Sequence, residues 1–262
     1  QISPPSFFNY NNGTLTNAGT ITQTSSVLQF NGCTVENLPG ALYDIQHAGT
    51  VWSGSGPGFG VINNSGTVQK SANAGVTTTS LTTFNNLAGG VVSVLTGELD
   101  LSNGGSLQGS LQAEAGAMLD FSSGTFALTG TLTGSGAGKV RLGGATFNGT
   151  SASAMLDFPT GLFEWRTGVL TGTLANAGEL TINPPSFVNL NNGTLTNAGT
   201  IIQAASVLQF NGGIIANLPG ALYDIQHAGT AWSGFGPGFG TINNSGTLQK
   251  SVNASVATTS LT

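Results

Sequence analysis

Charged side chains are scarce in this chain of 262 residues: they make up 6% of it, against about 25% in ordinary soluble domains. The 5 basic residues are scattered and form no positive stripe that could follow a nucleic-acid backbone. Glycine, with 41 residues, and many Asn, Ser and Thr residues take the place of charge. Disordered chains combine low hydrophobicity with high net charge, whereas here 39% of residues are apolar and the net charge is −5. We therefore expect a folded protein that does not bind nucleic acid.

Long apolar runs and cysteines are missing as well. No stretch approaches the roughly 18 apolar residues that a membrane-spanning helix needs, and the first residues show no charged segment followed by an apolar one. Cys33 is the single cysteine, and its counterpart in the repeat described next is Gly213, so it belongs to no required disulfide or metal set. Because the first residue is Gln1 and not Met, we expect the chain to be part of a longer or processed product.

The chain contains two copies of one sequence, the second of them incomplete. Residues 2–82 align without gaps with residues 182–262, and 17 of these 81 pairs differ. One full repeat unit therefore spans residues 2–181, and a partial second unit spans residues 182–262. The differences are mostly swaps between apolar or between small polar residues, while nearly all glycines recur. Internal repetition of this kind is typical of repeat architectures.

A shorter phrase recurs inside each unit: a turn that ends in Gly or Ala, followed by an apolar–polar–apolar triplet. These turns divide the full unit into eight coils of about 22 residues each. Each coil contains three segments with strand-like alternation, such as residues 13–17, 19–23 and 27–32, and helical periodicity is absent. The turn-closing residues are Gly19, Gly40, Gly66, Gly89, Gly116, Gly138, Ala154, Gly178 and Gly199.

Three short strands per coil predict an all-β fold, a right-handed parallel β-helix (β-solenoid) with about 22 residues per coil. Each strand would pair in parallel with its equivalent one coil away, because the other two sides of the coil supply the long connection that parallel pairing needs. We expect residues 1–262 to form a single continuous solenoid, in which eight coils at ~4.8 Å give an axial repeat of about 38 Å. A lone coil buries too little apolar surface to offset its ordering entropy, so stability must come from stacking.

The central residues of the triplets are nearly all polar, and the residues that flank them are apolar. This alternation predicts that the central residues point outward and that their neighbours form the core. The predicted outward column is Thr22, Asp44, Gln69, Ser93, Asp120, Arg141, Asp157, Thr181, Ile202, Asp224 and Gln249.

Asparagine recurs at one corner of the coil, at a nearly constant distance before the turn-closing glycine. Because Asn tolerates left-handed backbone and bonds to neighbouring main chain, amides stacked at this corner can form a ladder from coil to coil. The alternative is that Asn is simply a common turn residue. The predicted structural ladder consists of Asn17, Asn37, Asn63, Asn86, Asn176, Asn197, Asn217 and Asn243.

Three phrases of this chain resemble the repeats of filamentous-haemagglutinin-type and autotransporter-type bacterial surface proteins. They are Thr-Leu-Thr-Asn-Ala-Gly-Thr-Ile at 14–21, Ile-Asn-Asn-Ser-Gly-Thr-Val at 62–68 and Leu-Ala-Asn-Ala-Gly-Glu-Leu at 174–180. The resemblance implies a right-handed β-helical shaft outside the cell, with adhesion or scaffolding as its role. The near-identity of the two copies departs from the more irregular shafts of many such proteins and favours a fibre of tandem copies.

Some β-helix proteins cut polysaccharides with clustered carboxylates and a Lys or Arg on one sheet. The nearest candidates here are Asp120, Arg141 and Asp157, placed on three successive coils, with Asp100 and Glu114 nearby. General acid–base chemistry needs such groups within a few ångströms of one another. We interpret them as an alternating surface charge ladder and predict no catalytic residues.

His47 and His227 occupy equivalent turns, and neither has another His or Cys near it in the sequence, so no metal or cofactor site is predicted. Trp52 and Trp232, with the glycine-rich stretch at residues 54–60, could form an aromatic platform for a sugar ring. The alternative is a long corner loop whose aromatic residues cover the core.

These observations predict a secreted, cell-surface structural or adhesive protein of bacteria and not an enzyme. Its expected partners are further repeats of the same chain or other copies bound head to tail, and glycans or a neighbouring cell surface. The alternative function is a carbohydrate-binding or polysaccharide-degrading β-helix.

Overall fold

The computed structural model describes residues 1–3, 6–54, 59–234, 238–252 and 255–260. These residues form 31 strands and no helix. The strands pair in parallel and stack as a β-solenoid of about 11 turns with a spacing of roughly 22 residues, which confirms the predicted all-β solenoid. The chain divides into two compact units: unit 1 contains residues 1–126 and 134–140, and unit 2 contains residues 127–133 and 141–262.

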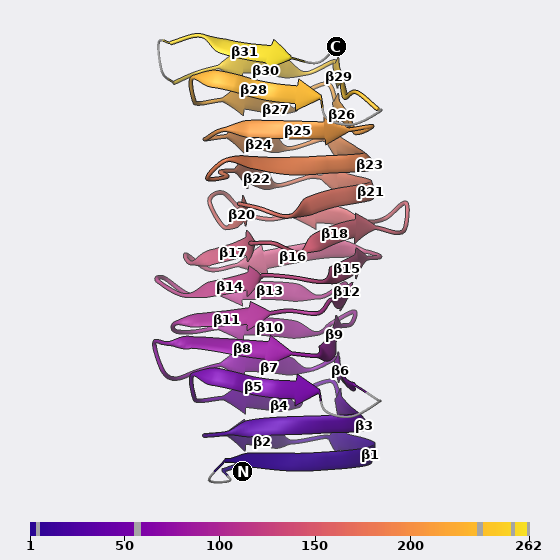
Figure 1. Cartoon of the computed structure of the whole chain (residues 1–262), viewed down its shortest axis with the longest axis vertical. Helices are drawn as coiled ribbons and strands as arrows, with labels where there is room; N and C mark the ends of the chain where they lie inside the picture. The colour runs from indigo at the N-terminus through magenta and orange to yellow at the C-terminus, as the bar shows by residue number, and fades with distance from the viewer. Residues whose placement is uncertain (4–5, 55–58, 235–237, 253–254, 261–262) are drawn as a thin grey trace. The chain divides into compact units, whose positions relative to one another are not determined.

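Unit 1 contains three columns of parallel strands, drawn from indigo to magenta in Figure 1. The first column is β2 (Thr20–Gln23), β4 (Leu42–Ile45), β7 (Thr67–Lys70), β10 (Val91–Val94) and β13 (Ser110–Ala113). The second is the first part of β1 (Phe7–Asn17) and of β3 (Val27–Asn37), β5 (Gly49–Gly54), β8 (Val76–Ser80), β11 (Glu98–Leu101) and β14 (Met118–Phe121). The third is the second part of β1 and of β3, β6 (Gly60–Asn64), β9 (Thr82–Asn86) and β12 (Gly105–Leu107), and we call it the asparagine column of unit 1.

Unit 2 also contains three columns of parallel strands. Its asparagine column is β16 (Thr131–Ser135), β19 (Met155–Asp157), the second part of β21 (Val169–Asn176) and of β23 (Phe187–Asn197), β26 (Ile214–Asn217) and β29 (Thr241–Asn244). Another is β20 (Phe163–Trp165), β22 (Glu179–Ile182), β24 (Thr200–Gln203), β27 (Leu222–Ile225) and β30 (Thr247–Lys250). The last is β18 (Thr146–Gly149), the first part of β21 and of β23, β25 (Val207–Asn211), β28 (Gly229–Gly234) and β31 (Ala257–Ser260). The remaining strands are β15 (Thr125–Leu128) and β17 (Lys139–Leu142).

Side chains alternate between the core and the surface along the strands. In β11, for example, Leu99 and Leu101 are fully buried while Asp100 between them points outward. Parallel pairing in register puts each inward residue against the equivalent inward residue of the next coil. The core of each unit is therefore a set of stacked apolar rows, as the triplet pattern predicts.

The predicted outward column is wrong between Ser93 and Thr181, whereas its last four members, Thr181, Ile202, Asp224 and Gln249, pair in register as predicted. The structure pairs Ser93 with Gln112, and Asp120 with Asp100 in another column. The sequence predicts Gly116 as the next turn-closing residue, but in the structure Gly109 has that role. Gly109 stacks directly on the preceding coil, where a Cβ would lie 2.0 Å from the Gly90 oxygen. The coil is shorter here than the average used to place the turns.

In unit 2 the predicted column is wrong at Asp157. Asp157 was aligned with Thr181, but Thr181 pairs with Glu164 of β20. β19, which ends at Asp157, pairs instead with β21 through Leu156 and Asn176. β20 has three residues and was overlooked, because Phe-Glu-Trp is too short to show a period by itself.

Candidate functional site

Unit 1 contains a ladder of buried asparagine amides. Nδ2 of Asn17 donates a hydrogen bond to Oδ1 of Asn37 (2.7 Å), Asn37 to Asn64 (2.8 Å), and Asn64 to Asn86 (2.8 Å). Each of the three donating amides also gives its second N–H to a backbone oxygen at 2.9–3.0 Å. The ladder therefore uses both donor hydrogens of each of these amides to join successive coils.

Unit 2 contains the same ladder. Asn176 donates to Asn197 (2.8 Å), Asn197 to Asn217 (2.8 Å), and Asn217 to Asn244 (2.7 Å). The second N–H of each donating amide again reaches a backbone oxygen, at 2.9–3.1 Å. Amides in this arrangement bond strand to strand and coil to coil, and buried bonds of this kind are stronger than exposed ones.

Asn63 and Asn243 are not members of the ladder, and the prediction is wrong by one residue at both. Their neighbours Asn64 and Asn244 point inward and take the position. Because successive side chains of a strand point to opposite faces, Asn63 lies on the outer surface, where it donates to Glu36 (2.6 Å). The number of residues between the ladder asparagine and the next glycine varies between coils, so this spacing does not show which of two adjacent asparagines points inward. The alternation of side chains along the strand does show it.

A second buried polar cluster joins side chains of three strands in unit 1, β2, β4 and β5. Nε1 of Trp52 donates to the hydroxyl of Tyr43 (3.2 Å), which donates to Oε1 of Gln23 (2.6 Å). Nε2 of Gln23 donates to the backbone oxygens of Ser26 (2.7 Å) and Val51 (3.0 Å). The rings of Tyr43 and Trp52 meet edge to face at 5.5 Å. We call this the Gln–Tyr–Trp cluster.

Unit 2 repeats the cluster with Gln203, Tyr223 and Trp232. Nε1 of Trp232 donates to the hydroxyl of Tyr223 (3.0 Å), which donates to Oε1 of Gln203 (2.7 Å). Burial raises the pKa of Tyr43 and of Tyr223, and the hydrogen bond from the tryptophan only partly opposes this shift. Both tryptophans are buried, Trp52 completely. This burial contradicts a sugar platform on Trp52 and Trp232 and fits the alternative, in which the aromatic residues cover the core. Residues 55–58 of the glycine-rich stretch lie outside the described residues.

The candidate carboxylates lie on different pairs of strands. Asp100 and Asp120 lie side by side on β11 and β14, but Asp157 is exposed on β19 opposite Thr133. Glu114 follows β13, where its backbone N–H donates to Val94. Within the described ranges, no group of three or more His, Cys, Asp and Glu side chains is arranged to hold a metal ion.

The two equivalent histidines bond to the turn that follows them. Nδ1 of His47 lies 2.8 Å from the oxygen of Ala48, and Nδ1 of His227 lies 2.8 Å from that of Ala228. Because a carbonyl oxygen only accepts, Nδ1 carries the proton in both rings. These contacts give both residues a structural role in the turn.

Lys70 is a buried lysine that the sequence analysis missed. Its side chain occupies an inward position of β7 and is fully buried, and Nζ donates to the oxygens of Ala72 (2.8 Å) and Asn73. Burial lowers the pKa of Lys70. The equivalent Lys250 is exposed and donates to Val252 (2.6 Å). The signal was present in the alternation of Thr-Val-Gln-Lys, which places the lysine on the same side as the valine.

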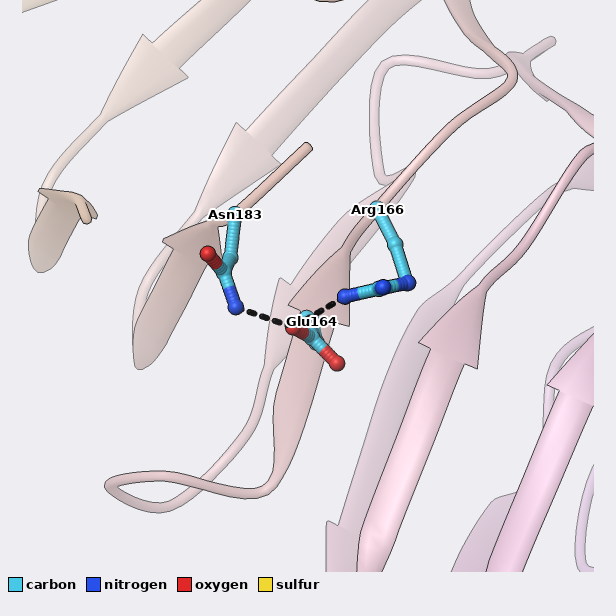
Figure 2. Close-up of polar contacts among 3 residues, drawn as sticks. All are labelled: Glu164, Arg166 and Asn183. Carbon is cyan, nitrogen blue, oxygen red and sulfur yellow. Dashed lines mark hydrogen bonds and ion pairs between the residues drawn. The ribbon is translucent and has the colours of Figure 1, made fainter. Parts of the chain in front are cut away.

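A small charged cluster lies on the outer surface of unit 2 (Figure 2). Oε1 of Glu164 accepts a hydrogen bond from Asn183 (2.7 Å) and lies 3.8 Å from the guanidinium of Arg166. The Arg166 side chain is 43% exposed, so the ion pair contributes little to stability. The cluster joins β20 to the end of β22.

Comparisons with known protein families, with curated proteins and with solved structures give no match. In the part of the chain that the structure describes, no helix has the length and hydrophobicity needed to cross a membrane. The function is therefore argued from the residues of the chain and from the solenoid fold.

Proposed function

We propose that the chain is part of an extracellular bacterial fibre or surface shaft of the filamentous-haemagglutinin or autotransporter type, with a structural and adhesive role. The observation that carries this proposal is the repetition of the same bonds between coils in two copies of one sequence. The Asn ladder and the Gln–Tyr–Trp cluster recur with nearly equal distances although 17 of 81 positions differ.

Conserved bonds between coils are what a fibre of tandem repeats needs, because each coil is stable only when others stack on it. In such a fibre this segment continues into further repeats or binds other copies head to tail, a contact that does not close and gives filaments. The low charge favours close stacking, since few like charges repel along the axis.

Electron microscopy and fibre diffraction of the native protein test this proposal. We expect thin unbranched fibres and a strong axial reflection near ~4.8 Å from the stacked coils. Protease treatment of intact cells should release the protein, and deletion of its gene should reduce attachment of the cells. A compact monomer that stays inside the cell would overturn the proposal.

The alternative function, a polysaccharide-degrading β-helix, predicts release of oligosaccharides from neutral or acidic polysaccharides. The same purified chain incubated with such polysaccharides separates the two functions. Products that accumulate with time would favour the enzyme, and their absence alongside fibres would favour the structural role.

A further inference from the structure

A pocket of about 190 Å³ opens on the surface of unit 1 beside the start of β9. Phe59, Leu81, Thr82, Thr83 and Asn103 line it. None of these side chains is charged, and the set combines one aromatic ring, one aliphatic chain, hydroxyls and an amide. Its volume is below the about 300–1,000 Å³ of pockets for drug-sized ligands, so a single ring suits it better.

Phe59 forms an exposed aromatic surface in this pocket, with 56% of the residue accessible to solvent. The end of β5 supports the ring: a Cβ on Gly54 would lie 2.8 Å from Cδ1 of Phe59 and 2.4 Å from the oxygen of Leu81. The ring can therefore pack here only because residue 54 is glycine. In the second copy, Gly234 and Phe239 repeat this packing, again at 2.8 Å.

The turn that presents Leu81 is strained. Leu81 has φ of 52°, a left-handed conformation that is unusual for a bulky side chain, and it is 45% exposed. The side-chain oxygen of Asn103 accepts hydrogen bonds from the backbone N–H of Thr82 (3.0 Å) and of Leu81. These bonds fix the turn, and they orient the amide so that its NH2 group remains a donor at the exposed Asn103.

The pocket adjoins a polar outer surface of the asparagine column, since Thr83 and Asn85 both point outward from β9. Ser106 donates to Asn85 (3.0 Å), and Asn85 donates to Asn63 (2.9 Å). Amides and hydroxyls thus continue from the pocket across three strands. A chain of linked polar rings could follow this surface beyond the pocket.

We infer that this pocket binds one ring of a neutral saccharide. The C–H face of the ring lies on Phe59, and ring hydroxyls bond to the NH2 group of Asn103 and the hydroxyl of Thr83. A charged ligand meets no opposite charge among the lining residues, and a purely apolar ligand leaves the amide donor unused. The inference is separate from the fibre proposal, because it depends on unit 1 alone.

Binding of the 262-residue chain to an array of neutral, sialylated and sulfated oligosaccharides tests the inference. The methyl glycoside of the best neutral ligand is then titrated by NMR, with an apolar peptide as a further arm. We expect Phe59→Ala to weaken saccharide binding at least about tenfold, a loss of about 1.4 kcal/mol. Asn103→Asp keeps the oxygens that hold the turn but removes the donor, and we expect a several-fold loss.

Phe239→Ala is the matched control. Phe239 packs on Gly234 as Phe59 packs on Gly54, but the position equivalent to Asn103 falls after Thr262, so this substitution should leave binding unchanged. Thermal unfolding of each variant shows whether the fold persists. Failure of every neutral saccharide to bind overturns the inference, as does equal binding by Phe59→Ala, or a ligand that is charged or purely apolar. Fibres seen by microscopy would be unaffected by any of these results.

Discussion

The repeated segments and the segment between them hold their coils together in different ways. In both copies, side-chain amides bond from coil to coil, from Asn17 to Asn86 and from Asn176 to Asn244. The ladder stops where leucine takes the inward position, since Asn86 pairs with Leu107 and Asn176 with Leu156.

Between the two copies, several phenylalanine rings pack against one another in the core. In unit 1, Phe121 and Phe126 meet edge to face at 5.0 Å. In unit 2, Phe163 stacks on Phe158 at 4.8 Å and on Phe147 at 6.1 Å. These rings bury much apolar surface, but they impose less direction than hydrogen bonds do.

The difference teaches that amide ladders fix register while aromatic packing tolerates variation in coil length. A slip by one residue would leave every buried amide without its partner, which costs about 1–3 kcal/mol for each. Stacked rings lose less when the neighbouring turn changes length. This agrees with the position of the short coil, which runs from Val91 to its partner Ser110 and coincides with the end of the asparagine ladder of unit 1.

The largest expected effect comes from the aromatic segment. Phe163→Ala removes a buried ring between two others and should lower the free energy of unfolding by about 3–5 kcal/mol. Urea unfolding followed by circular dichroism measures the change. Phe187→Ala is the control, because Phe187 is 45% exposed and should lose far less. Equal losses would mean that the rings do not hold the segment together.

The ladder can be tested at two adjacent asparagines. Asn64→Ala removes bonds to Asn37, Asn86 and a backbone oxygen, and we expect a loss of about 2–4 kcal/mol. Asn63→Ala removes only surface bonds and should cost less than about 1 kcal/mol. Comparison of the two urea midpoints decides the register. A larger effect at Asn63 would contradict the inward position of Asn64.

Much of this fold could be predicted from sequence because the signals are local and repeated. Alternation assigned Leu119 and Phe121 to the core, and repeated Asn-x-Gly turns indicated the coil. The alignment failed where a coil shortened, since no local pattern shows that Gly109 replaces Gly116 as the turn. The single continuous solenoid over residues 1–262 and the surface location stay predictions.

The sites were harder to predict than the fold. Sequence could not show that Trp52 is fully buried, because its partners Tyr43 and Gln23 lie in other strands. It also could not show that Phe59 and Asn103 line one pocket, since they are distant in the sequence and only the solenoid brings them together. Contacts between coils depend on coil length, which varies.

The Gln–Tyr–Trp clusters predict a loss of stability at alkaline pH. Burial raises the pKa of Tyr43 and Tyr223 above the ordinary 10.0, so both stay neutral in the folded state while tyrosines of the unfolded chain ionise. The unfolded state then binds fewer protons, and stability is fully present below pH 10 and falls above it. Each Tyr→Phe substitution should cost about 1–3 kcal/mol at pH 8. The urea midpoint of the unmodified chain should therefore approach that of the variant with both Tyr→Phe substitutions when the pH is raised from 8 to above 10. Parallel pH profiles of the two proteins would contradict the buried clusters.

The smallest effect is expected at Lys70, a buried polar residue of the first copy that belongs to neither the ladder nor the Gln–Tyr–Trp cluster. Burial lowers its pKa below the ordinary 10.5, so the unfolded state holds the proton over a range of pH in which the folded state has lost it. Stability due to this group therefore rises with pH through that range and levels off above 10.5.

Lys70→Met removes both the burial of charge and the bonds to two backbone oxygens, and these opposed terms leave a net change within about 1 kcal/mol at pH 7. Subtracting the urea midpoint of Lys70→Met from that of the unmodified chain cancels the tyrosine contribution, and the difference should increase from pH 7 to pH 10. For Lys250→Met, at the exposed equivalent position, the difference in urea midpoint should not change with pH. An equal change with pH for both variants would contradict the lowering of the Lys70 pKa by burial.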